Sequence, residues 1–195
     1  MLIGAQHLVD RLRHERQRAA ELLELRRRLA ALPGPGEVSG ELMALARELR
    51  ERRERLALAL GAVEACSSCA VGHPLPFGKW SGGHCCGGTT DRYFSDDELH
   101  ALALAGTTAA RLRAPRGEQA GCAFRGPEGC SLSARDRPNL CTRFLCRELE
   151  RELARRGALA VIAPLQEAIR VTFERFVELR ERAAEDELFG PEAGP

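Results

Sequence analysis

Eight cysteines, all between positions 66 and 146, are the residues of this sequence with the clearest capacity for chemistry. A deprotonated thiol is a strong, soft ligand for zinc, for iron and for iron–sulfur clusters. The first group is Cys66, Cys69, Cys85 and Cys86, and the second is Cys122, Cys130, Cys141 and Cys146. We therefore expect thiolates from both groups to meet around metal.

The spacing of the cysteines leaves the identity of the metal open. Cys66-Ser-Ser-Cys69 has the spacing by which a turn commonly presents two sulfurs to one ion. The gaps of the second group are seven, ten and four residues long, which suits an iron–sulfur cluster as well as zinc. We expect iron, as ions or as an iron–sulfur cluster, or zinc, in two four-ligand sites or in one site beside structural or redox-active thiols. His73 and His84 are alternative ligands, although a surface or supporting role is favoured for both.

Three other uses of cysteine compete with metal binding. Thiols that serve only as small apolar core residues would not be confined between two long cysteine-free segments. Disulfides require an oxidising compartment, but residues 1–10 lack the basic and then apolar pattern of a secretory signal, so a cytoplasmic location is expected. A catalytic dithiol at Cys66 and Cys69 lacks the strand-then-helix context of a thioredoxin-type site. Metal binding is therefore favoured.

Composition excludes some classes of partner. The 29 basic and 28 acidic residues give a net charge of +1, so no global basic field attracts nucleic acid. No apolar run approaches the roughly 20 residues that span a bilayer, so no membrane partner is expected. The aromatic fraction of 5% predicts a core built mostly from Leu, Ala and Val.

The elements before the cysteines are predicted to be two helices. Apolar residues recur at heptad spacing over about residues 7–32 and again over 42–63. Pro33-Gly34-Pro35-Gly36 breaks the helix between them, because proline lacks an N–H donor and glycine permits a reversal. We expect an antiparallel hairpin that brings Glu15 near residues 52–55. Its narrow apolar stripe leaves a further face to cover the cysteine region or a second subunit.

Shorter elements are expected between and after the cysteines. Ser95 followed by Glu98 is a capping box that predicts a helix from Asp96 to about Ala105. Turn-forming residues dominate from Cys122 to Cys141, with short strands around Ala123-Phe124 and Ser131-Leu132.

The C-terminal part is predicted to be helical. A helical pattern resumes at Thr142 and ends at Gly157, and a final helix begins near Pro164, which suits a first-turn position.

Several of these segments carry a family resemblance. The most specific is Arg137-Pro138 followed by Cys141, Phe144 and Cys146, and the others are Cys66-x2-Cys69, Cys85-Cys86, Cys122-Ala123-Phe124 and Gly129-Cys130-Ser131-Leu132. Together they resemble the YkgJ-type cysteine-cluster family, described as zinc- or iron-chelating domains, over about residues 66–150. The resemblance implies metal chelation by these cysteines and a distant relation to flagellin lysine methylases, whose cysteine-rich part looks similar.

Two other functions stay open beside metal binding. One is a metal-dependent protein-modifying enzyme related to those methylases. It is less favoured for two reasons. No glycine-rich cofactor loop follows a predicted strand, and no candidate pair of a catalytic acid and base lies outside the solvated faces of helices. The other is an adaptor that binds partners through its helices, with a purely structural metal.

Together the patterns predict a mainly α protein in four parts. Residues 1–65 form an N-terminal antiparallel helical hairpin, coiled-coil-like, which serves as a scaffold or as a surface for a homodimer or protein partner. Residues 66–150 form a central loop-rich cysteine-cluster metal domain. Residues 151–189 form C-terminal helices packing back on it, and residues 190–195 form a disordered tail.

Overall fold

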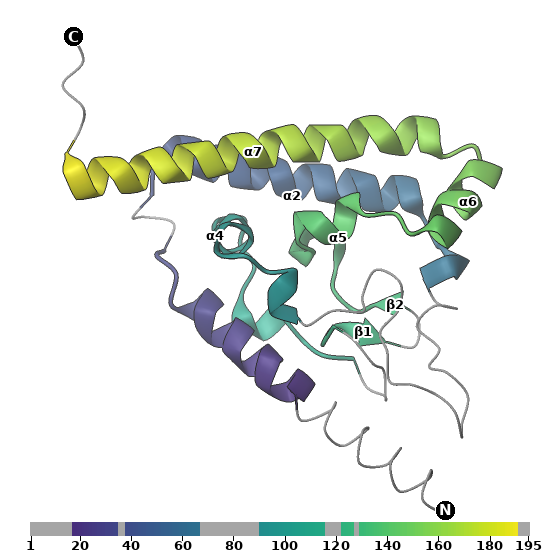
Figure 1. The fold of residues 1–195 in the computed structure, drawn as a ribbon, viewed down its shortest axis with the longest axis horizontal. Coiled ribbons are helices and arrows are strands. Elements are labelled where there is room, and N and C mark those ends of the chain that lie inside the picture. Colours follow the sequence, from purple (N-terminus) through teal and green to yellow (C-terminus); the bar gives the residue numbers. More distant parts are fainter. Residues whose placement is uncertain (1–16, 35–37, 67–89, 116–121, 127–128, 191–195) are drawn as a thin grey trace, which may run out of the picture.

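The computed structural model describes residues 17–34, 38–66, 90–115, 122–126 and 129–190. Over these ranges the protein is mainly helical, which confirms the predicted fold class (Figure 1). No helix in this part of the chain is both long enough and apolar enough to cross a membrane.

The elements follow one another along the chain with short connections. A helix over residues 17–30 comes first. The labelled helices are α2 (Gly40–Leu60), α4 (Asp96–Leu104), α5 (Asn139–Arg143), α6 (Arg147–Arg155) and α7 (Leu159–Phe189). The strands β1 (Arg125–Gly126) and β2 (Gly129–Cys130) pair antiparallel, and the 3-10 helices are η2 (Thr90–Arg92), η3 (Ala109–Arg111) and η4 (Ala134–Asp136).

Helices α2 and α7 form the frame of the molecule. They run antiparallel, side by side (Figure 1), and Arg52 of α2 donates to the carbonyl of Ala168 at 2.7 Å. The larger core cluster lies between them and includes Leu42, Leu45, Leu49, Leu56, Ile162, Ile169 and Phe176. Burial of these side chains, at about 25 cal/mol per Å² of apolar surface, holds the frame together.

The helix over residues 17–30 belongs to a different core. Its Leu22, Leu25 and Leu29 pack in a second cluster with Phe94 of the loop before α4 and with Phe124. Within the described residues, the apolar stripes of the two N-terminal helices lie in separate clusters, and their pairing as an antiparallel hairpin stays a prediction. The first helix covers the cysteine region, whereas Glu15 lies outside the described residues.

Local capping signals act largely as predicted. Ser95 caps α4 by accepting a hydrogen bond from the N–H of Glu98 at 3.3 Å. Gly157 ends α6 with φ +67°, and the next N–H, of Ala158, donates to the carbonyl of Leu153 at 2.9 Å. This is the bonding pattern of a helix end that requires a left-handed residue, and glycine adopts that conformation without a Cβ penalty.

Three predicted boundaries are corrected. Helix α7 begins at Leu159, so Pro164 lies inside it. Pro164 is the sixth residue of α7, beyond the first four N–H groups that lack an intrahelical partner, so it removes one backbone hydrogen bond from the second turn. The two strands lie closer to their turn than predicted. The helical run expected from Thr142 is broken at Phe144, where ψ of 118° is extended and separates α5 from α6.

Candidate metal centre

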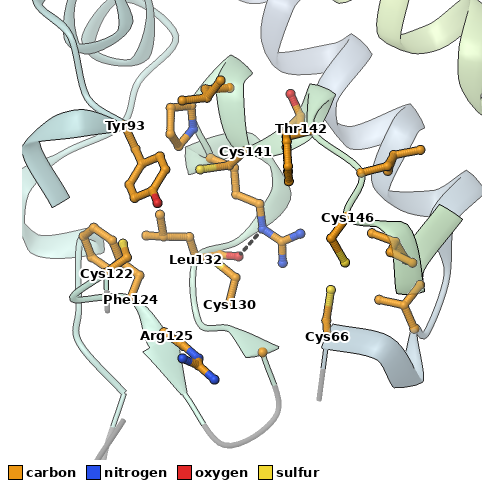
Figure 2. A pocket seen from close by; sticks show the side chains of 18 of the residues that line it. Cys66, Tyr93, Cys122, Phe124, Arg125, Cys130, Leu132, Cys141, Thr142 and Cys146 are labelled. Atoms are coloured by element: carbon orange, nitrogen blue, oxygen red, sulfur yellow. Dashed lines mark hydrogen bonds between the residues drawn. The ribbon is translucent and has the colours of Figure 1, made fainter. Parts of the chain in front are cut away.

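All five cysteines in the described part of the chain line one cavity of about 390 Å³ (Figure 2). They are Cys66, Cys122, Cys130, Cys141 and Cys146. One comes from the first predicted group and four from the second, so the structure brings members of both groups to the same space. The other predicted ligands, Cys69, Cys85 and Cys86, lie outside the described residues, as do His73 and His84.

The backbone before Cys66 is held by α6. Glu152 accepts hydrogen bonds from the N–H groups of Glu64 at 3.1 Å and of Ala65 at 2.8 Å. These bonds favour the carboxylate and lower the pKa of Glu152, with the Ala65 N–H as the largest cause. Because those N–H groups begin a helical turn at residues 64–66, Glu152 caps the turn that carries the first cysteine.

Strand β2 lies against Cys66. Gly129 has φ +101°, and a Cβ built on it would lie 3.3 Å from the Cβ of Cys66. Only glycine therefore combines this backbone conformation with such close approach. In this way Cys66 is placed beside the strand that carries Cys130, the residue that follows Gly129 in β2.

Cys122 lies just before β1, in a segment clamped by the first helix. Arg18 donates to the carbonyls of Ala123 and Arg125, both at 3.0 Å. Thr90 accepts from the N–H of Ala123 at 3.0 Å. Cys122 is 7% exposed, and this burial raises the pKa of its thiol to about 11. A metal that binds Cys122 near neutral pH must therefore displace a proton.

Cys141 and Cys146 stand on either side of the break between α5 and α6. Cys141 lies within α5, whereas Cys146 is the N-cap residue of α6 with an extended ψ of 160°. Figure 2 shows the sulfur atoms of Cys146 and Cys66 pointing toward one another, with Cys122 on the opposite side of the cavity. The break between the two helices thus directs the Cys146 side chain toward Cys66.

Helix α5 is anchored by a buried polar network that the sequence interpretation missed. The N–H of Asn139 donates to Glu98 Oε1 at 2.7 Å, and Arg53 bridges Glu98 Oε2 at 3.3 Å and Asn139 Oδ1 at 2.9 Å. Arg53 has no exposed surface. Burial raises the pKa of Glu98 to about 7, and the positive charge of Arg53 opposes that shift. The heptad track through Leu45, Leu49 and Leu56 passes through Arg52 and not Arg53, so no local signal identified Arg53.

The charged residues that line the described cavity are all arginines: Arg92, Arg125 and Arg137. Arg137 donates from Nε to the carbonyl of Leu132 at 3.0 Å, the dashed line in Figure 2. Phe144 also lines the cavity with 49% of its surface exposed, so it stands at the rim.

The thiols surround this space rather than converge on one point. Among the described residues, no three His, Cys, Asp or Glu side chains stand close enough together to hold one metal ion. Comparison of the chain with protein-family models, with curated protein sequences and with solved structures gives no match.

Proposed function

We propose that this protein binds a metal centre in the cavity through its clustered cysteine thiolates, as iron ions, an iron–sulfur cluster or zinc. One observation carries the proposal: five thiols from separate segments, including Cys66 and Cys146 at the two ends of the cysteine region, line a single cavity. Burial of isolated cysteines would not require segments so far apart in sequence to deliver their thiols to one place.

The donor set fits soft metals. The described lining contains five thiols and no carboxylate. Magnesium and calcium prefer oxygen ligands, whereas thiolates select zinc, iron–sulfur clusters and copper(I). The ligands in this proposal are the eight cysteines, with Cys69, Cys85 and Cys86 added to the described five. A zinc ion would supply structural cross-linking, and an iron–sulfur cluster would supply electron transfer as well.

The family resemblance supports the same proposal. The segment from Arg137 to Cys146, which resembles the cysteine-cluster family most specifically, forms one wall of the cavity through Arg137, Pro138, Cys141 and Cys146. The proposal includes a reducing, cytoplasmic location, in which thiols stay available to metal. It also includes assembly with a second copy of the chain or with another protein through the helical hairpin of residues 1–65.

The test is anaerobic purification followed by elemental analysis, sulfide analysis and an absorption spectrum. Iron with acid-labile sulfide and a brown colour is expected for a cluster, and colourless protein with stoichiometric zinc for a structural site. The double substitution Cys141→Ser and Cys146→Ser should reduce the metal content. Thr172→Ser, a buried position on α7 away from the cavity, should leave it unchanged.

The proposal fails if metal-free, folded protein takes up neither zinc nor iron with sulfide under reducing conditions. Tight binding of a methyl donor by the metal-loaded protein would favour the alternative, a protein-modifying enzyme. Metal that proves necessary for folding, together with a partner bound by the helices, would favour the adaptor.

A further inference from the structure

The charged residues in the described part of the cavity lining are of one sign. Three arginines, Arg92, Arg125 and Arg137, belong to its described lining, and no Asp or Glu does. Over the whole chain the basic and acidic residues nearly balance, at 29 and 28. The positive cavity is therefore a local arrangement and not a reflection of composition.

A thiolate-bound metal centre supplies the opposite charge. Four thiolates around one divalent ion leave a net negative charge, and so do four thiolates around an oxidised iron–sulfur cluster. Burying an uncompensated charge among apolar side chains is costly unless other charges or hydrogen bonds compensate it. The cavity walls are largely apolar, with Leu132, Leu145 and Leu149 among them. Nearby guanidinium groups would offset that cost.

Arg137 is the best placed of the three arginines to contact such a centre. Its Nε is held by the carbonyl of Leu132 at 3.0 Å, and its two Nη atoms have no hydrogen-bond partner among the described residues. Pro138 follows it with φ fixed near −65°, and Asn139 is tied to Glu98. The backbone on the C-terminal side of Arg137 is therefore rigid, and the guanidinium group is oriented before any ligand arrives.

We propose that the cavity is built for a centre of net negative charge and that Arg137 donates hydrogen bonds from its Nη atoms to the sulfur atoms of that centre. This inference rests on the proposed metal-binding function. Hydrogen bonds to sulfur and nearby positive charge stabilise the more negative state of a centre. They raise the reduction potential of an iron–sulfur cluster and strengthen the binding of a zinc thiolate site.

The test compares Arg137→Gln and Arg137→Lys with Arg113→Gln. Arg113 is an exposed arginine that also donates from Nε to a backbone carbonyl, that of Ala110 at 2.9 Å, but it is absent from the described cavity lining. If the protein carries zinc, competition with a chromophoric chelator should show affinity lower by about 10- to 100-fold in Arg137→Gln. If it carries a cluster, a redox titration should show a lower potential. Arg113→Gln should match the wild type.

Arg137→Lys separates the charge from the anchoring bond to Leu132. It keeps the positive charge and loses Nε, so its affinity or potential should lie between those of the wild type and Arg137→Gln. The inference is overturned if Arg137→Gln matches the wild type, or if the lysine and glutamine variants lose the same amount. Wild-type protein that binds no metal would instead overturn the proposed function, so the two failures are distinguishable.

Discussion

The backbone N–H of Asn139 donates to the buried carboxylate of Glu98 at 2.7 Å, although the two residues are 41 positions apart. Pro138, the N-cap residue of α5, provides no side-chain cap for this short helix. A carboxylate at the N-terminus of a helix satisfies a free N–H and interacts favourably with the helix dipole. Glu98 on α4, which is distant in sequence, thus provides the N-terminal cap that no residue directly before α5 provides. This bond fixes the helical turn that carries Cys141.

Removal of the Glu98 carboxylate should destabilise the protein strongly. Glu98→Ala leaves the guanidinium of Arg53 buried and without its counter-charge, for which a loss of about 3–5 kcal/mol in unfolding free energy is expected. Glu98→Gln should cost less, because its amide oxygen can still accept from Asn139. Urea unfolding measures both. Glu167→Ala, which removes an exposed carboxylate paired with Arg170, should stay within about 0.5 kcal/mol of the wild type. Equal losses in Glu98→Ala and Glu167→Ala would contradict the assigned role.

A methyl group at Gly129 should disturb the metal site as well as the fold. Gly129→Ala combines a left-handed φ of +101° with a Cβ 3.3 Å from the Cβ of Cys66, so Cys66 or strand β2 must shift. Gly157→Ala is the matched control, because Gly157 has φ +67° and nothing within 4 Å of a built Cβ. Both variants should lose at least about 1–2 kcal/mol of stability from backbone strain. Only Gly129→Ala should also lower the affinity for metal, measured by chelator competition. If Gly129→Ala bound metal with the affinity of the wild type, Cys66 would not belong to the metal site.

The cap at the start of the Cys66 turn gives a further test. Glu152→Ala removes the acceptor of the Glu64 and Ala65 N–H groups, and loss of a helix cap costs about 0.5–2 kcal/mol. Hydrogen exchange should become faster at the Ala65 amide and stay unchanged at the Ala123 amide, which Thr90 holds on the other side of the cavity. Protection that falls equally at both amides would indicate general destabilisation in place of a local cap.

The burial of Cys122 predicts a dependence of stability on pH in the metal-free protein. Its pKa is about 11 in the fold against 9.0 for an ordinary thiol, with burial as the main cause. Between these values the native state retains a proton that the unfolded state has lost, so the free energy of unfolding falls as pH rises through this window. The loss amounts to on the order of 2 kcal/mol. Urea unfolding at pH 8.5 and pH 10.5 should show a steeper decline for the wild type than for Cys122→Ala. Parallel declines would show that Cys122 titrates normally.

Local signals in the sequence predicted the elements that depend on neighbouring residues. Ser95 capped α4 and Gly157 ended α6, because caps and chain reversals are set by hydrogen bonds within a few positions. The confinement of the cysteines to one region likewise predicted which residues would gather. Five of them line one cavity, and three lie outside the described residues.

The partners of each helix were decided only by the tertiary structure. A heptad stripe predicts that one face of a helix is buried, but it does not identify the element that buries it. In the structure, α2 packs on α7, whereas the helix over residues 17–30 covers the cysteine region. Glu98 shows the same limit. The capping box predicted its role at the start of α4, whereas its side chain turns inward to Arg53 and Asn139. Burial changes the energetics of charge, and burial is a property of the assembled chain. The residue types thus determined the chemistry that the protein can offer, and long-range packing decided where that chemistry is placed.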